Sequence, residues 1–235
     1  RAWRLPAALL RLLIPEYLES KKMGNNPFGT LTPIDADADC CGGGAAGDSI
    51  EVLPDLIDLG EGVASVMPVV DSAAAEKCHA AGIGALVALQ LGHQHDRKWG
   101  VPLHVSGEVL YLSDGKFIYS GGIWDGCQSN MGPAAVLKIG GVHVCIASFP
   151  TYEWCGEQYA AFGLDVTRMK YIVAKNPMNY RMAFGHCCEH FIVLDTKGPT
   201  PATCKHLPYS HSLRPAFPWD SAIIDPIWVL GQNDF

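Results

Sequence analysis

The glycine-rich stretch from Asp39 to Ser49, DCCGGGAAGDS, has the residue types of a loop that could bind an anion or a developing oxyanion. Its glycines come directly before an expected helix amino terminus, where unpaired N–H groups and the helix dipole attract negative charge. A substrate carboxylate or carbonyl is the expected ligand. A nucleotide is not expected, because the Gly-Lys-Ser/Thr ending of a phosphate-binding loop is absent. The alternative is a glycine loop that only turns the chain.

A first cluster with metal-ligating residue types is His93, His95 and Asp96, which follow an expected strand. Alternate residues of an extended segment lie on one face, so the two imidazoles could bind the same metal ion. A solvated turn is the alternative for this cluster.

A second cluster, HCCEH at residues 186–190, matches the His-x-x-Glu-His pattern of one class of zinc proteases through His186, Glu189 and His190. That pattern requires a long helix. Here Gly185 opens a turn before it, and the apolar run 191–194 after it reads as a strand. A catalytic zinc site is therefore not expected at this cluster, although its side chains suit adventitious metal binding.

Two basic residues, Lys175 and Arg181, follow the expected strand 169–174. Proteins of the α/β class commonly place ligand-binding side chains after strands, and an arginine can hold a carboxylate through two parallel hydrogen bonds. A surface ion pair is the alternative for Arg181. For nucleophilic catalysis the sequence offers no candidate, because no Gly-x-Ser-x-Gly elbow occurs and no cysteine has the neighbours of a known nucleophile.

The elements that must position these residues alternate between helix and strand and then become hairpins. Asp48 with Glu51 is expected to form a capping box at a helix start, and Asp71 is expected to cap the next helix. The turn formers Ser113–Gly115 and Gly140–Gly141 predict two hairpins. This order predicts an α/β fold, a mixed sheet with flanking helices and β-hairpins. The expected elements are a helix over 48–60, a strand over 63–70, a helix over 72–81, and strands over 85–91, 105–112, 116–120, 134–139, 142–148, 169–174 and 191–194.

The composition limits the class of protein. The 235 residues are 49% hydrophobic and 17% charged, which suits a globular protein with a sizeable core. The net charge of -7 and the scattered Lys and Arg residues argue against nucleic acid. The run Leu5 to Ile14 contains Arg11 and is shorter than the roughly 20 residues that span a bilayer, so no membrane partner is expected. Nine cysteines, including the adjacent pairs Cys40–Cys41 and Cys187–Cys188, indicate a reducing, cytoplasmic compartment.

Many short segments, in the same order along the chain, resemble the carboxy-terminal half of the microcystinase C family. Their order carries more weight than any single match, and together they cover roughly residues 36 to 222. The segments are Asp39 with GGG at 42–44 and GDS at 47–49, AAGIGA at 80–85, LG at 91–92, GVPL at 100–103, LSDGKF at 112–117, NMGPAAV at 130–136, FGLD at 162–165, VAK at 173–175, DTKGP at 195–199, RP at 214–215 and PWD at 218–220.

The resemblance implies a zinc-dependent hydrolase, a peptidase, whose Asp and His metal ligands lie in a separate amino-terminal domain. The chain would then be the carboxy-terminal domain that helps to form the substrate cleft, with no catalytic residue or metal ligand assigned to it. Its substrate would be a peptide or an amide-containing small molecule, and a homo-oligomer stays open. The implied substrate-binding residues are Asp39, Gly42, Gly43, Gly44, Asp48, Ser49, Lys175 and Arg181.

The chain also departs from the family pattern. Cys40–Cys41 replaces Asn-Pro before the three glycines, and Asn176 and Asn179 replace a Ser and a His after Lys175. Two alternatives therefore stand beside the hydrolase: a catalytically silent binding or scaffolding domain of the same fold, and a self-contained zinc protein that uses one of the histidine clusters. The expected organisation is a linker or amino-terminal remnant over 1–34, the family domain over 35–222 and a tail over 223–235.

Overall fold

The computed structural model describes residues 3–6, 32–36, 40–41, 45–95, 97–120, 124–151, 156–175 and 180–198. All of them belong to one compact unit, Arg1–Ala202, and the second unit, Thr203–Phe235, lies outside the described residues. The predicted boundary between residues 34 and 35 falls within a strand, Thr32–Ala36. The domain boundaries stay a prediction.

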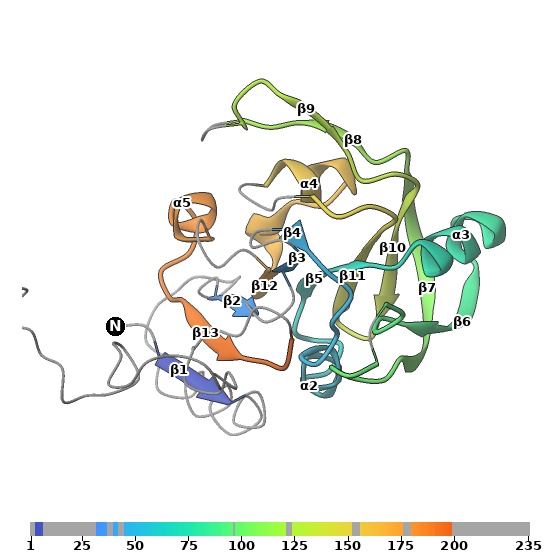
Figure 1. Cartoon of the computed structure of the whole chain (residues 1–235), viewed down its shortest axis with the longest axis horizontal. Helices are drawn as coiled ribbons and strands as arrows, with labels where there is room; N and C mark the ends of the chain where they lie inside the picture. The colour runs from blue at the N-terminus through green and yellow to red at the C-terminus, as the bar shows by residue number, and fades with distance from the viewer. Residues whose placement is uncertain are drawn as a thin grey trace, which may run out of the picture. The chain divides into compact units, whose positions relative to one another are not determined.

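Within the described residues, nine strands form one mixed sheet (Figure 1). Six neighbouring strands are parallel, and the last three, β10, β7 and β6, are each antiparallel to the strand before. The predicted α/β fold with a mixed sheet is confirmed. In spatial order the strands are β1 (Trp3–Pro6), β13 (Ile192–Asp195), β2 (Thr32–Ala36), β12 (Tyr171–Ala174), β5 (Ser65–Val70), β11 (Val142–Ala147), β10 (Ala134–Ile139), β7 (Leu103–Ser113) and β6 (Leu86–Leu91).

Both faces of this sheet are covered, because its central strands are apolar on both sides. In β12, Tyr171 and Val173 pack in one core cluster while Ile172 and Ala174 pack in the other. The first cluster contains the buried residues of α2 (Leu53–Asp58) and α3 (Ser72–Ala81). The second contains those of α4 (Glu157–Ala161), α5 (Tyr180–Phe184) and β8 (Lys116–Ile118), a strand that pairs with β9 (Gln128–Asn130) in a small two-stranded sheet. Another short pair, β3 (Cys40–Cys41) with β4 (Ala45–Ala46), precedes α2.

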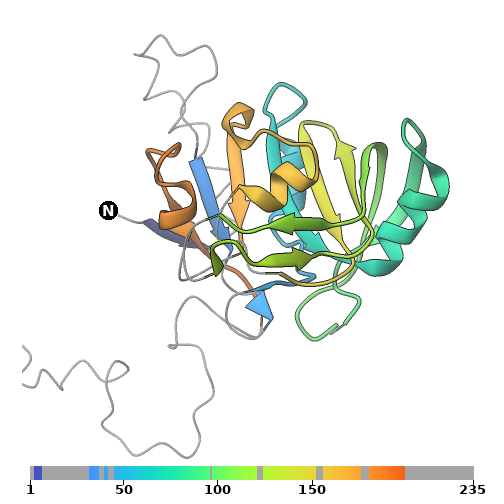
Figure 2. The same ribbon diagram turned by 90° about the horizontal axis from the view of Figure 1, so that it is seen from above.

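The two views agree on the placement of α4, which lies beside the β8–β9 pair in both (Figures 1 and 2). Figure 1 shows α2 away from this pair. The sheet therefore forms the middle layer between two unlike coverings. None of the described helices is long and apolar enough to cross a membrane.

Several predicted elements are confirmed. Asp71 caps α3 by accepting a hydrogen bond from Ala74 N at 3.0 Å, and Gly82 ends this helix. β10 and β11 form the hairpin predicted around Gly140–Gly141. The strands expected near 63–70, 169–174 and 191–194 correspond to β5, β12 and β13.

Three expectations are wrong. α2 begins at Leu53, not Asp48, because Pro54 suits only the first turn of a helix and the carboxylates of Asp48 and Glu51 bind elsewhere. β6 is an edge strand rather than a buried one, and Leu86 at its start is 85% exposed. β7 and β8 do not pair, since β7 continues the large sheet while β8 pairs with β9.

Candidate functional site

The parallel strands bring several functional candidates to one edge of the sheet. β5, β11, β12, β2 and β13 run in the same direction, so their carboxyl ends lie at this edge. The segment Gly47–Ser49, which ends the glycine-rich stretch, is fixed there because Val70 N donates to Gly47 O at 3.0 Å. In α/β proteins this edge is the usual place for a ligand. Of the rest of the predicted loop, Cys40–Cys41 and Ala45–Ala46 form the short pair β3 and β4, whereas Asp39, Gly42, Gly43 and Gly44 lie outside the described residues.

Lys175 joins β12 to the same segment. It directly follows the strand and is only 1% exposed. Its Nζ donates to Ser49 O at 2.6 Å and to Gly47 O at 3.2 Å. A buried ammonium requires such partners, because an unpaired charge in the protein interior is very costly. The sequence-predicted residues Ser49 and Lys175 are thus in direct contact, and Ser49 is also buried.

Asp48 joins the segment to the turn after β6. Its carboxylate Oδ2 accepts a hydrogen bond from His95 N at 2.9 Å, and its carbonyl accepts one from His93 N at 2.8 Å. Gly92 N donates to Asp71 Oδ2 at 3.0 Å. A Cβ on Gly92 would lie 2.6 Å from Asp48 O, so this glycine permits the close approach of the two backbones.

His93 has an unusual backbone at this junction. Its φ is +48°, in the left-handed region that a non-glycine residue seldom adopts, and its side chain is buried. A Cβ on Gly100 would lie 2.4 Å from the His93 ring, so the ring packs directly on that glycine backbone. His95 is exposed, whereas His93 is enclosed. Asp96 lies outside the described residues.

Arg181 lies in α5 and is exposed. Its guanidinium carbon is 4.8 Å from the ring centroid of Phe191 and 5.2 Å from that of Tyr180. These cation–π contacts hold the side chain against two aromatic rings and leave its exposed fork able to bind an anion.

The HCCEH cluster does not form a helical zinc site. α5 ends at Phe184, and residues 185–187 form a turn. His190 Nε2 lies 3.9 Å from Glu189 Oε2, while His186 is exposed. Among the described residues no group of three or more His, Cys, Asp or Glu side chains could hold a metal ion. The HCCEH residues therefore do not fit a catalytic zinc ion.

Two further anchors of the edge were not expected from the sequence. Glu51 Oε2 accepts a hydrogen bond from Lys197 N at 2.8 Å, which links the segment to the chain after β13. Asp71 uses one carboxylate oxygen for α3 and the other for Gly92. The sequence pattern suggested that both carboxylates cap helices. It could not reveal their distant backbone partners, because those contacts leave no local pattern in the sequence.

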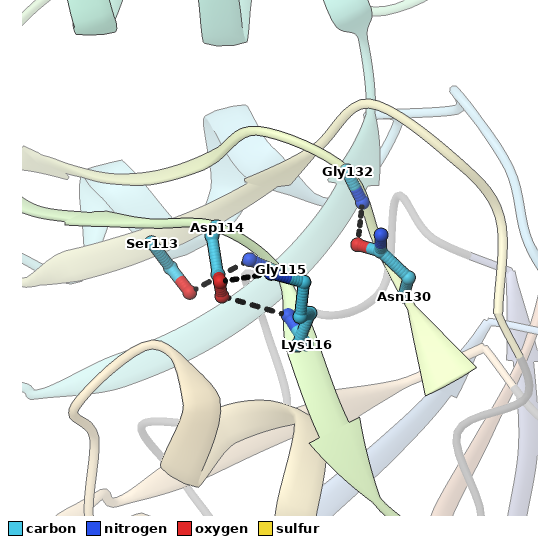
Figure 3. A network of polar contacts seen from close by, with 6 residues as sticks. All are labelled: Ser113, Asp114, Gly115, Lys116, Asn130 and Gly132. Carbon is cyan, nitrogen blue, oxygen red and sulfur yellow. Dashed lines mark hydrogen bonds and ion pairs between the residues drawn. The ribbon is translucent and has the colours of Figure 1, made fainter. Parts of the chain in front are cut away.

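The β8–β9 pair forms an open hollow of about 720 Å³ on the other core layer, lined by Lys116, Phe117, Ile118, Gln128, Ser129 and Asn130. A polar network lies at the end of the pair where β8 begins and β9 ends (Figure 3). Gly115 N donates to Ser113 Oγ at 3.0 Å, and Gly132 N donates to Asn130 Oδ1 at 2.8 Å. The hydrogen bond from Lys116 Nζ to Asp114 holds the pKa of that carboxyl below its usual range.

A family model, a curated protein and a solved structure all match this chain. The family model described as MlrC C-terminus matches residues 35–211. Microcystinase C of Sphingomonas sp. is 21% identical over 179 residues, which are 76% of this chain and 34% of that protein. The crystal structure of a proposed metallopeptidase from Mesorhizobium sp. BNC1 has a TM-score of 0.71 and 24% identity, over 88% of this chain and 40% of that one. The last likeness concerns the fold alone. The chain spans about a third of the length of the curated relative.

Proposed function

The chain belongs to the MlrC C-terminus family, and on this premise we propose that it is the carboxy-terminal domain of a zinc-dependent peptidase and forms part of the substrate cleft. The zinc ion and its ligands would be supplied by an amino-terminal domain. The name of the curated relative, Microcystinase C, and the description of the structural relative as a proposed metallopeptidase support this assignment. The substrate would be a peptide or an amide-containing small molecule.

The observation that carries the proposal is the attachment of Gly47–Ser49 to the carboxyl edge of the sheet. Three parts of the chain bind this short segment: a backbone N–H of β5, backbone N–H groups of the turn after β6, and the buried ammonium of Lys175. A loop held at several points can keep its remaining N–H groups in a fixed position, and fixed donors are what a substrate carbonyl or carboxylate requires. The preceding glycines would complete this cradle.

The substrate-binding residues divide into two roles in this proposal. Asp39, Gly42, Gly43 and Gly44 would face the substrate directly, and Arg181 would bind a carboxylate through its exposed guanidinium. Asp48, Ser49 and Lys175 would act as positioning residues, because their contacts hold the end of the loop. None of these residues moves a proton in the proposal, so the general base, like the metal, would come from the other domain.

The decisive experiment compares the isolated chain with the whole gene product in a peptide-hydrolysis assay with and without a chelator. The whole protein should hydrolyse the peptide until the metal is removed, and the isolated chain should be inactive.

In the whole protein, Arg181→Ala should raise KM for a substrate with a free carboxylate by about tenfold or more, since hydrogen bonds to charged groups are worth about 1.5–3 kcal/mol. Arg168→Ala, which changes another exposed arginine, is the matched control.

Two results would overturn the proposal in different ways. Chelator-sensitive hydrolysis by the isolated chain would place the metal site within it. A whole protein that binds peptides but never cleaves them would identify a silent binding domain. An unchanged KM for Arg181→Ala would remove only the role of that residue.

A further inference from the structure

The adjacent pair Cys187–Cys188 brings two sulfur atoms together away from the sheet edge described above. Adjacent side chains of a strand point to opposite sides, but these two residues follow α5 in a turn. Cys187 N and Cys188 N both donate to Phe184 O, at 3.1 and 2.8 Å. The turn holds the two Sγ atoms 3.7 Å apart. This arrangement comes from the backbone and not from a disulfide, since both cysteines are free.

The distance between the two Sγ atoms would allow a single atom to bind both of them. A central atom that binds two sulfurs at about 2.3 Å spans about 3.3 Å between them at a right angle, as in pyramidal trivalent arsenic, and about 3.8 Å at a tetrahedral angle. The observed 3.7 Å is therefore already close to the distance a two-sulfur ligand needs. Cys187 is half-buried and gives access from solvent, while Cys188 is only 5% exposed and packs in the second core cluster.

The surroundings keep both sulfur atoms in the thiol form. Burial raises the pKa of both thiols, so they are protonated at neutral pH. A divalent metal ion would require both thiols to lose their protons to solvent, which burial opposes. An electrophile that reacts with two thiols and releases their protons as water does not require free thiolates to persist in the apolar cluster around Cys188.

We propose that Cys187 and Cys188 form a two-sulfur binding site for a trivalent arsenical. With an organoarsenic oxide, the two arsenic–oxygen bonds break and two arsenic–sulfur bonds form. The oxygen leaves as water with the two thiol protons, and no electron is transferred. The product is an uncharged nine-membered ring closed through the side chains and the peptide bond of the two residues, which suits the apolar surroundings of Cys188.

The test uses phenylarsine oxide and intact-mass measurement on the reduced protein. The starting protein carries Cys40→Ser and Cys41→Ser, which leaves Cys187–Cys188 as the one adjacent cysteine pair in the sequence. One phenylarsenic group per chain should be retained in excess 2-mercaptoethanol and removed by 1,2-ethanedithiol. Peptide mapping should place it on the peptide that contains both cysteines.

The matched comparison adds Cys187→Ser, which changes the half-buried member and keeps the buried Cys188 in the core. This variant should keep the circular dichroism spectrum of its parent and lose the retained arsenical completely. Cys127→Ser, which removes an exposed single cysteine, should retain it. Retention by the Cys187→Ser variant, or no retention by the parent, would overturn the proposal.

Discussion

Lys175 is a charged residue in a nearly closed environment, and its two backbone partners explain why it is tolerated there. Its Nζ binds the carbonyl oxygens of Gly47 and Ser49. Carbonyl dipoles stabilise a buried ammonium, and the ammonium in turn prevents the carbonyls from being buried without a donor. A side chain that the sequence suggested as a ligand contact thus also has a structural role at the sheet edge.

Replacing this residue tests its structural role separately from any activity. Lys175→Met keeps most of the side-chain length but removes both hydrogen bonds, so we expect the free energy of unfolding to fall by about 1–3 kcal/mol in urea denaturation. Lys138→Met is the matched control, because Lys138 is exposed on β10, and it should change stability by about 0.5 kcal/mol or less. Equal stabilities for the two variants would contradict the anchoring role.

At the scale of elements, the turn between β7 and β8 explains why the predicted hairpin does not form. Gly115 has a φ of +77°, and its carbonyl accepts a hydrogen bond from Met131 N at 2.8 Å. A Cβ on Gly115 would lie 2.0 Å from Gly132 O. The turn therefore packs against the chain after β9, which directs β8 away from β7 and towards β9.

Two glycine substitutions separate backbone strain from this close contact. Gly126→Ala introduces strain alone, because Gly126 has a φ of +74° with no atom within 4 Å of an added Cβ, and it should cost about 1–2 kcal/mol. Gly115→Ala adds the contact with the Gly132 backbone to a similar strain and should cost clearly more in the same urea experiment. Equal losses would show that the turn can shift without cost.

The elements that the sequence predicts correctly are those with local signals. Asp71 and Gly82 mark both ends of α3, and the apolar run of β12 is long enough to identify it. The sequence misplaced the start of α2 because Asp48 and Glu51 have the spacing of a capping box, yet their carboxylates bind backbone N–H groups 47 and 146 residues away. The contact between Lys175 and Ser49 was equally invisible, since it spans 126 residues and has no local pattern.

At the scale of the whole described unit, the two core layers share the strands of one sheet. Neighbouring residues of β10 alternate between them, with Leu137 in the cluster that contains α2 and α3 and Val136 in the cluster that contains α4 and α5. Because each central strand contributes side chains to both layers, unfolding of a strand disrupts the packing of both. The binding edge is thus built on a scaffold that should unfold as one cooperative unit, as small domains usually do.

Substitutions on opposite faces of β10 test this coupling. Both Leu137 and Val136 are fully buried, so Leu137→Ala should cost about 2–5 kcal/mol and Val136→Ala about 1–3 kcal/mol. Each should lower the midpoint of the same single transition when urea unfolding is followed by far-UV circular dichroism and by tryptophan fluorescence. Lys138→Ala, the next and exposed position, should leave that midpoint almost unchanged. Two transitions, each sensitive to only one of the core variants, would mean that the layers fold independently and that the edge carrying Gly47–Ser49 depends on only one of them.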